Sequence, residues 1–130
     1  MFPASTPGQP DAAFVEFADP RGATEATITD LVRMGYLVRT RADEAVVTPR
    51  SGDTTQRDAA FASGAQIVST DYPVPGLATR WGSTYVAQLP GGVLARCNPV
   101  RAPPTCRARD LVEPKKGPRG GAQPNARGRR

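Results

Sequence analysis

Histidine is missing from all 130 residues of this sequence, and its absence restricts the chemistry that the chain can perform. General acid–base catalysis at about pH 7 needs a group that titrates in that range, and histidine is the usual one. The only cysteines are Cys97 and Cys106, so the ligand set of a zinc site is missing as well. We therefore expect neither histidine-based catalysis nor metal binding from these residues by themselves.

Long apolar runs are also missing. No stretch approaches the roughly 18 apolar residues that indicate a transmembrane helix. The first residues, MFPASTPGQPDAAF, have no basic region and no apolar core, so they do not predict a signal peptide. Hydrophobic residues make up only 38% of the chain, whereas glycine and proline together account for 27 residues (13 plus 14). We expect one modest domain, with part of the chain unpacked.

Net positive charge is missing outside the C-terminal tail. Residues 107–130 hold eight basic side chains against two acidic ones, whereas residues 1–106 hold nine basic against ten acidic. The net charges are therefore +6 and −1, and the folded part has no basic face for a specific nucleic-acid partner. We expect the tail at 107–130 to be a disordered, solvated extension. The alternative is a weak, salt-sensitive attraction of this tail to anionic lipid or nucleic acid.

Short β-branched runs alternate with helical segments after a lead-in, residues 1–13, that we expect to be loop or disordered. The expected elements are a strand at 14–17, a helix at 22–34, a strand at 36–40, a connecting loop at 45–52, a helix at 53–63 and a strand at 65–70. The spacings between Val15, Val38 and Val68 are ordinary for βα units. Right-handed crossovers would make all three strands parallel, so we expect a β-α-β-α-β unit.

Local signals set the expected helix ends. Thr24 is a candidate N-cap of the first helix, and Gly35 stands where a left-handed residue ends it. Asp53 and Gln56 resemble a capping box for the second helix, which Gly64 ends.

Residues after Pro73 have a different pattern. The runs 84–89 and 93–97 flank Pro90-Gly91-Gly92, which predicts a β-hairpin. Three parallel strands need cover on both faces and both edges. Two helices cannot cover both faces, and the hairpin could protect one edge. We therefore predict an α/β fold that corresponds to the C-terminal part of a (β/α)8 TIM barrel, followed by the hairpin and the basic tail.

The two cysteines lie in the segment RCNPVRAPPTC. A Pro-rich loop has little core of its own, so a disulfide between Cys97 and Cys106 would help to order it, and would indicate an oxidising compartment. The alternative is a pair of free, buried thiols.

Three segments together resemble one family: MGYLVRTRAD, DTTQRDAAFASGAQIVSTDYP, and LPGGVLARCNPV with Cys106 after it. They are similar, from about Phe14 to Cys106, to the C-terminal portion of the bacterial calcium-dependent phosphoinositide-specific phospholipase C-like family. The resemblance implies a secreted TIM-barrel phosphodiesterase acting on inositol lipids, with a Ca²⁺ ion and a pair of histidines as general base and acid.

This sequence departs from the family pattern because it has no histidine. We expect residues 14–106 to be a partial phosphodiesterase domain that is inactive alone, with a missing N-terminal half as its partner. The alternatives are a non-catalytic phosphate-binding α/β module, or anionic-surface binding through the basic tail.

Two arginines are the candidate substrate-binding residues. Side chains alternate along a strand, so Arg39 and Arg41 share a face with Leu37 and Asp43. If that face lines the barrel, the guanidinium groups can hold a phosphate and stabilise developing charge. The alternative is that they form internal salt bridges with Asp43, or with Glu16 or Asp71.

The remaining candidates follow strand ends. Asp71 could orient a histidine from another strand, or cap the turn at Pro73. Tyr72 could stack on a sugar or inositol ring, or pack at the rim. Glu16 and Asp19 could contact a ligand or metal, although N-capping by Asp19 is the simpler role. Trp81 could pack on the predicted hairpin or lie at an interface.

Overall fold

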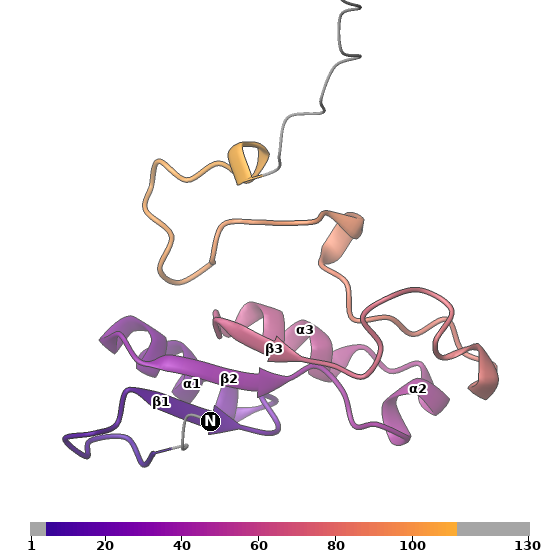
Figure 1. Cartoon of the computed structure of the whole chain (residues 1–130), viewed down its shortest axis with the longest axis horizontal. Helices are drawn as coiled ribbons and strands as arrows, with labels where there is room; N and C mark the ends of the chain where they lie inside the picture. The colour runs from indigo at the N-terminus through magenta and orange to yellow at the C-terminus, as the bar shows by residue number, and fades with distance from the viewer. Residues whose placement is uncertain (1–4, 112–130) are drawn as a thin grey trace, which may run out of the picture.

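A computed structural model describes residues 5–111 of the chain (Figure 1). Its helices and strands, in order, are β1 (Phe14–Phe17), α1 (Ala23–Met34), β2 (Leu37–Arg41), α2 (Val47–Ser51), α3 (Thr55–Ala62) and β3 (Ile67–Ser69). Three 3₁₀ turns follow: η1 (Thr79–Trp81), η2 (Pro90–Gly92) and η3 (Ala108–Leu111). Within residues 5–111, no helix is long and apolar enough to cross a membrane.

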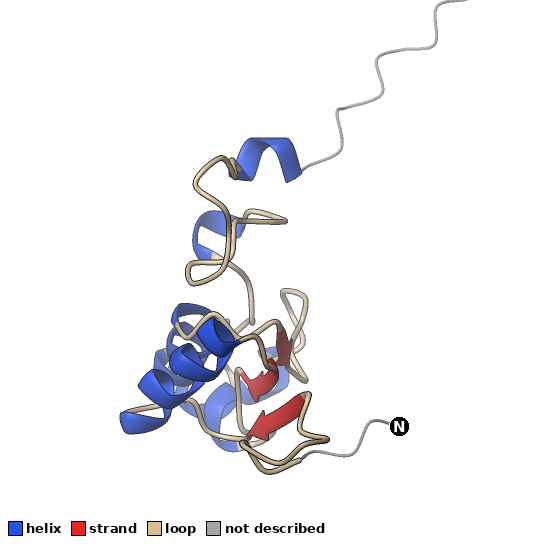
Figure 2. Ribbon diagram, turned by 90° about the vertical axis from the view of Figure 1, so that its left-hand side faces the viewer, coloured by secondary structure: helices blue, strands red, loops and turns tan. Residues whose placement is uncertain are grey.

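The three strands form one parallel sheet in the order β1-β2-β3. Val15 is paired with Val38 and Thr40 with Val68. Both long helices lie on the same side of these strands (Figure 2). The predicted α/β unit of three parallel strands is confirmed, whereas closure into a TIM barrel is not.

The core lies between the sheet and α1. Ile28, Val32 and Val38 have no exposed surface, and Val15 and Leu31 are almost completely buried. Ile28, Leu31 and Val32 have the i, i+3, i+4 spacing that places side chains on one helix face. Burial of each such side chain contributes about 1.5–3 kcal/mol, so this small cluster supplies much of the stability.

The helix ends differ in part from the prediction. Gly35 has a left-handed backbone (φ 99°) and its N–H reaches the carbonyls of Leu31 and Val32, as the sequence suggested. The N-cap of α1 is Gly22, so the choice of Thr24 was wrong.

The predicted capping box is also wrong. Gln56 is buried, and its amide nitrogen donates to the carbonyls of Ala18 and Arg41, at 3.4 Å each, where β1 and β2 end. Asp53 instead accepts hydrogen bonds from the backbone and hydroxyl of Thr55, which lowers the pKa of its carboxyl.

The segment expected as a loop at 45–52 contains the short helix α2. Pro49 is its third residue, where a helix leaves backbone N–H groups without carbonyl partners, so the missing N–H costs little.

The predicted hairpin at 84–89 and 93–97 is wrong. Neither run forms a strand, and η2 occupies the turn between them. Hydrogen bonds from arginine side chains to backbone carbonyls connect this segment to the helices instead. Arg57 donates to Val86 O (3.1 Å), Arg96 to Phe61 O, and Arg101 to Arg33 O (2.8 Å). We call residues 84–101 the C-terminal strap, because these contacts fasten it along α3 to the end of α1.

The predicted disulfide between Cys97 and Cys106 is present, and the bridged loop is anchored to the domain. Asn98 Nδ2 donates to Gly64 O at 2.8 Å, and its oxygen accepts the N–H of Val100. A Cβ on Gly64 would come within 2.4 Å of Val100, and Gly64 has φ 78°, so only glycine fits there.

The chain ends are described only in part. Residues 5–13 form turns that approach the sheet, with Ser5 N–H donating to Phe14 O at 3.0 Å. The tail predicted from residue 107 begins with η3, and its remainder, 112–130, lies outside the described residues.

Candidate functional site

Within residues 5–111, one face of the sheet carries no helix (Figure 2), and the candidate arginines lie on it. Val38 and Thr40 point toward the helices and are fully buried. Arg39 and Arg41 alternate with them and therefore point to the uncovered face. The register places Glu16 beside Arg39, and Arg41 beside Ser69, which brings side chains of all three strands together.

Arg39 is held by two neighbours. Its Nη1 forms an ion pair with Glu16, and its Nη2 donates to Ser69 Oγ at 3.1 Å. About a third of its side chain remains exposed. Glu16 is therefore a partner of Arg39, which is the internal salt bridge that the sequence left open.

Arg41 is held more loosely. Its Nη2 lies 3.9 Å from Asp71 Oδ2, with 38% and 57% of the two side chains exposed. An exposed pair at this distance is typically worth about 0–1 kcal/mol and is screened by salt. Of the two arginines on this face, Arg41 is thus the one that an incoming anion can engage at the lower cost.

Asp71 and its neighbours are organised by a buried carboxylate, Asp43. Asp43 is fully buried and accepts hydrogen bonds from Thr70 Oγ1 and from the N–H of Asp71 (3.3 Å). Tyr85 donates to Ala42 O at 2.9 Å, and its hydroxyl also lies 3.5 Å from Asp43. Burial raises the pKa of Tyr85 above its ordinary value.

Sequence reasoning named Asp43 only as a partner for the arginines and missed this structural role. One signal was available: Asp43 follows the end of β2 and Thr70 follows the end of β3. Parallel neighbours end at one edge, so a buried hydroxyl–carboxylate pair between them was open to prediction.

Asp19 forms a separate charged group at the end of β1. Arg21 donates through Nε (2.9 Å) and Nη2 (2.8 Å) to the Asp19 carboxylate, and Nη2 also lies 3.4 Å from Glu44. The hydrogen bond from Arg21 lowers the pKa of Asp19. The simpler role suggested for Asp19, capping α1, is not what the structure has, because α1 has no side-chain cap.

Tyr72 has no free ring face for a substrate. It is 2% exposed, packs edge-on against Tyr85 with ring centroids 5.8 Å apart, and donates to Ala45 O at 2.6 Å. Tyr72 therefore packs in the interior, which is the alternative to stacking on a substrate ring. Trp81 donates to the Tyr72 hydroxyl at 3.4 Å, so it is attached to this cluster and not to a hairpin.

The carboxylates at this edge do not fit a Ca²⁺ site. Calcium takes six to eight oxygen ligands, several of them usually carboxylate. Glu16, Asp19 and Asp71 each face an arginine, and Asp43 accepts hydrogen bonds in the interior. In the described part of the chain no three potential metal-ligating side chains converge.

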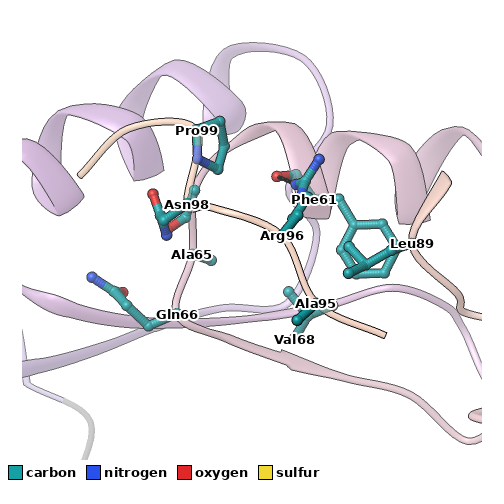
Figure 3. A pocket seen from close by; sticks show the side chains of 10 residues that line it. Phe61, Ala65, Gln66, Val68, Leu89, Ala95, Arg96, Asn98 and Pro99 are labelled. Atoms are coloured by element: carbon teal, nitrogen blue, oxygen red, sulfur yellow. Dashed lines mark hydrogen bonds between the residues drawn. The ribbon is translucent and has the colours of Figure 1, made fainter. Parts of the chain in front are cut away.

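A pocket lies elsewhere, between α3, β3 and the C-terminal strap (Figure 3). It measures about 460 Å³ and is lined mainly by apolar side chains, among them Phe61, Val68 and Leu89. Arg96 lies over the Phe61 ring at 5.7 Å and donates to Phe61 O, so its guanidinium is already engaged. The pocket is on the helix side of the sheet, away from Arg39 and Arg41.

Comparison with known proteins supplies the family. A sequence model described as "Phosphoinositide phospholipase C, Ca2+-dependent" matches residues 1–99, about three quarters of the chain. No curated protein and no solved structure matches. The family is calcium-dependent by its description, which does not place the ion among the residues described above. The match over most of the sequence, together with the parallel α/β unit, shows that the chain belongs to the Ca²⁺-dependent phosphoinositide phospholipase C family.

Proposed function

We propose that residues 14–106 form the phosphate-holding part of a phosphoinositide phospholipase C-like phosphoric diester hydrolase. In this proposal Arg39 and Arg41 bind the phosphodiester of an inositol lipid. The observation that supports it most strongly is their joint position on the uncovered sheet face, partly exposed and toward the carboxyl ends of the strands. Ligands of parallel α/β folds bind at this edge.

The two arginines would act unequally. A guanidinium can donate two parallel hydrogen bonds to phosphate oxygens. Arg41 needs only to leave an exposed contact of 3.9 Å with Asp71, whereas Arg39 must exchange its pair with Glu16. Arg41 is therefore the primary phosphate ligand, and Arg39 is a second ligand or the electrostatic support of the first.

These residues would not cleave the diester alone. The sequence has no histidine, and Asp71 is an exposed carboxylate that can orient a base but does not replace it. We propose that a further β/α segment supplies the base and acid and covers the open face, which makes the present sheet the last part of a (β/α)8 barrel. Asp71 would then orient a histidine of that segment.

The disulfide between Cys97 and Cys106 supports a location outside the cytoplasm, as family resemblance suggested. The second candidate is a phosphate-binding module without catalysis. If ligand binding requires no further segment, the ion pairs on the open face favour this candidate.

The test is titration of the full 130-residue chain with glycerophosphoinositol, the soluble diester of the lipid headgroup. Arg41→Gln should weaken binding at least about tenfold, since a charged hydrogen bond contributes roughly 1.5–3 kcal/mol. Arg33→Gln is the matched control, because Arg33 is exposed and forms a comparable surface pair with Asp30 on α1. Equal affinity of the two variants would refute a phosphate site at Arg41.

A further inference from the structure

The two residues that flank Cys97 hold the C-terminal strap on the end of α3 (Figure 3). Arg96 donates to Phe61 O, one of the last carbonyls of the helix, and Asn98 Nδ2 donates to Gly64 O at 2.8 Å. Carbonyls in the last turn of a helix have no partner within the helix, so a donor from elsewhere satisfies them. The strap therefore closes the end of α3 from both sides of one cysteine.

The disulfide loop beyond Cys97 has a second anchor, on the apolar core. Val100 packs against the core cluster, and Arg101 Nη1 donates to Arg33 O at 2.8 Å. Asn98 Oδ1 accepts the N–H groups of Val100 and Arg101, at 2.9 and 3.0 Å. These hydrogen bonds are few and only partly buried, and ordering a residue costs about as much as one such bond returns. The order of the loop therefore depends on its covalent closure.

The segment that follows, residues 102–111, is tied back to the strap by the disulfide. Its backbone hydrogen bonds are local, with no acceptor earlier in the sequence than Asn98. Within the described residues 5–111, no hydrogen bond or ion pair joins it to the sheet or to the long helices. Figures 1 and 2 show this segment standing apart from those elements. Its position is thus set by the bond to Cys97.

The environment of the disulfide favours attack by a thiolate. Both cysteines are partly exposed, Arg96 and Arg107 adjoin them in sequence, and Arg101 lies within the loop. Two carboxylates lie on neighbouring segments, Asp110 along the chain and Asp30 on α1, and each is paired with an arginine of its own segment. Positive neighbours stabilise a cysteine thiolate as it leaves, and exposed disulfides exchange more readily than buried ones.

We propose that this disulfide is a thiol-sensitive clasp for the end of the C-terminal strap. A thiolate of a dithiol reductant attacks one sulfur of the bond between Cys97 and Cys106, which gives a mixed disulfide and one cysteine thiolate. The second thiolate of the reductant then attacks the mixed disulfide. The products are the cyclic disulfide of the reductant and two cysteine thiols, which take up the two thiol protons and two electrons.

Reduction would open the loop at residues 97–106 and release its contacts with Gly64 and with the core. The sheet and its ion pairs would stay in place, because none of them contains a residue of the loop. The inference does not rest on the phosphodiester proposal, since the loop lies away from the open face.

Hydrogen exchange of the full 130-residue chain, with and without dithiothreitol, tests the clasp. Counting of free thiols follows the loss of the disulfide. The amides of Val100 and Arg101 should exchange about 10–100-fold faster after reduction, because closure of a loop of about ten residues contributes a factor of this order. Ala42 is the internal control, since its N–H donates to Ser69 O at 2.9 Å beside the sheet, and its exchange should change less than about threefold. Reoxidation should restore the protection.

Variants separate the bond from its charged surroundings. C97S/C106S should reproduce the reduced pattern without a reductant, and wild type under dithiothreitol gives the same measurement if this variant does not fold. R107Q, beside Cys106, should slow reduction about twofold. The matched control R109Q removes the same charge from an exposed residue that is paired with Asp110, and should leave the rate unchanged.

Three results would overturn the proposal. The first is reduction that leaves the exchange of Val100 and Arg101 unchanged, because the disulfide would then be a passive link. The second is a disulfide that resists dithiothreitol until urea unfolds the chain. The third is equal acceleration at Ala42, which would mean that reduction unfolds the whole domain and that the loop is no separate clasp.

Discussion

Val38 and Arg39 are neighbours in β2, yet they lie in opposite environments. Val38 is fully buried against α1, whereas Arg39 faces away from the helices with a third of its side chain exposed. The same contrast separates Thr40 from Arg41. Along one strand, alternate residues therefore belong to a packed, helix-covered face and to an open, charged face.

The difference between the two faces separates stability from chemistry. The helix-covered face holds the apolar cluster, and its contacts explain why a chain of this composition folds. The open face holds ion pairs that are partly exposed and individually weak. Substitutions on the first face should unfold the protein, whereas those on the second should change ligand binding and leave the fold intact.

The largest difference in stability is expected between variants of two isoleucines, one on each face. Ile28 is fully buried on the covered side, and Ile67 is 41% exposed on the open face. Ile28→Ala should lower the free energy of unfolding by about 2–5 kcal/mol, because it removes buried methyl groups and leaves a cavity. Ile67→Ala should cost less than about 1 kcal/mol. Urea unfolding measures the free energy of unfolding of both variants. Equal losses would show that the two faces do not differ in their contribution to stability.

A second comparison concerns two carboxylates at the same sheet edge. Asp43 is buried and accepts from Thr70 and Asp71, whereas Asp71 is exposed and faces Arg41. Asp43→Ala should cost about 2–3 kcal/mol because it leaves buried donors without an acceptor. Asp71→Ala should cost less than about 0.5 kcal/mol. A midpoint of thermal unfolding that moves equally in both variants would disprove a structural role specific to Asp43.

The smallest effect tests charge at the end of β1. Hydrogen bonding from Arg21 lowers the pKa of Asp19, so this pair stabilises the fold above the ordinary carboxyl pKa. The stabilisation is lost as the pH falls through the lowered value. Because both side chains are well exposed, it should amount to only a few tenths of a kcal/mol, roughly.

Arg21→Gln should raise the pKa of Asp19 toward its ordinary value, about 3.9. Titration of the carboxyl carbon by NMR measures this directly, with Asp30 as an internal reference on α1. An unchanged pKa of Asp19 in the Arg21→Gln variant would mean that Arg21 does not lower it.

The sequence was sufficient to predict the five elements of the parallel unit, because their signals are local. Alternating β-branched residues, a helical apolar face and Gly35 each act within a few positions, and β1 matches its predicted bounds. The shared face of Arg39 and Arg41 also follows from strand alternation. The disulfide followed from a Pro-rich loop without a core.

The failures involve partners distant in sequence. Apolar runs around Pro90 and the two glycines have the pattern of a hairpin, but the hydrogen bonds of Arg57, Arg96 and Asn98 connect this strap to α3 and to Gly64 after it. Gln56 was expected to cap its own helix, and it bridges the ends of β1 and β2. Local propensity does not contain such tertiary hydrogen bonds, and they decide the outcome where local preference is weak.

The central claim is that the open face holds a phosphodiester that the chain does not cleave alone. Phosphorus NMR of glycerophosphoinositol, mixed with the 130-residue chain and Ca²⁺, tests both parts in one experiment. We predict a diester resonance that broadens or shifts with wild type but not with R39Q/R41Q, and that persists without product. Formation of a cyclic or monoester phosphate by the chain alone, or a diester resonance that wild type does not perturb, would contradict the account.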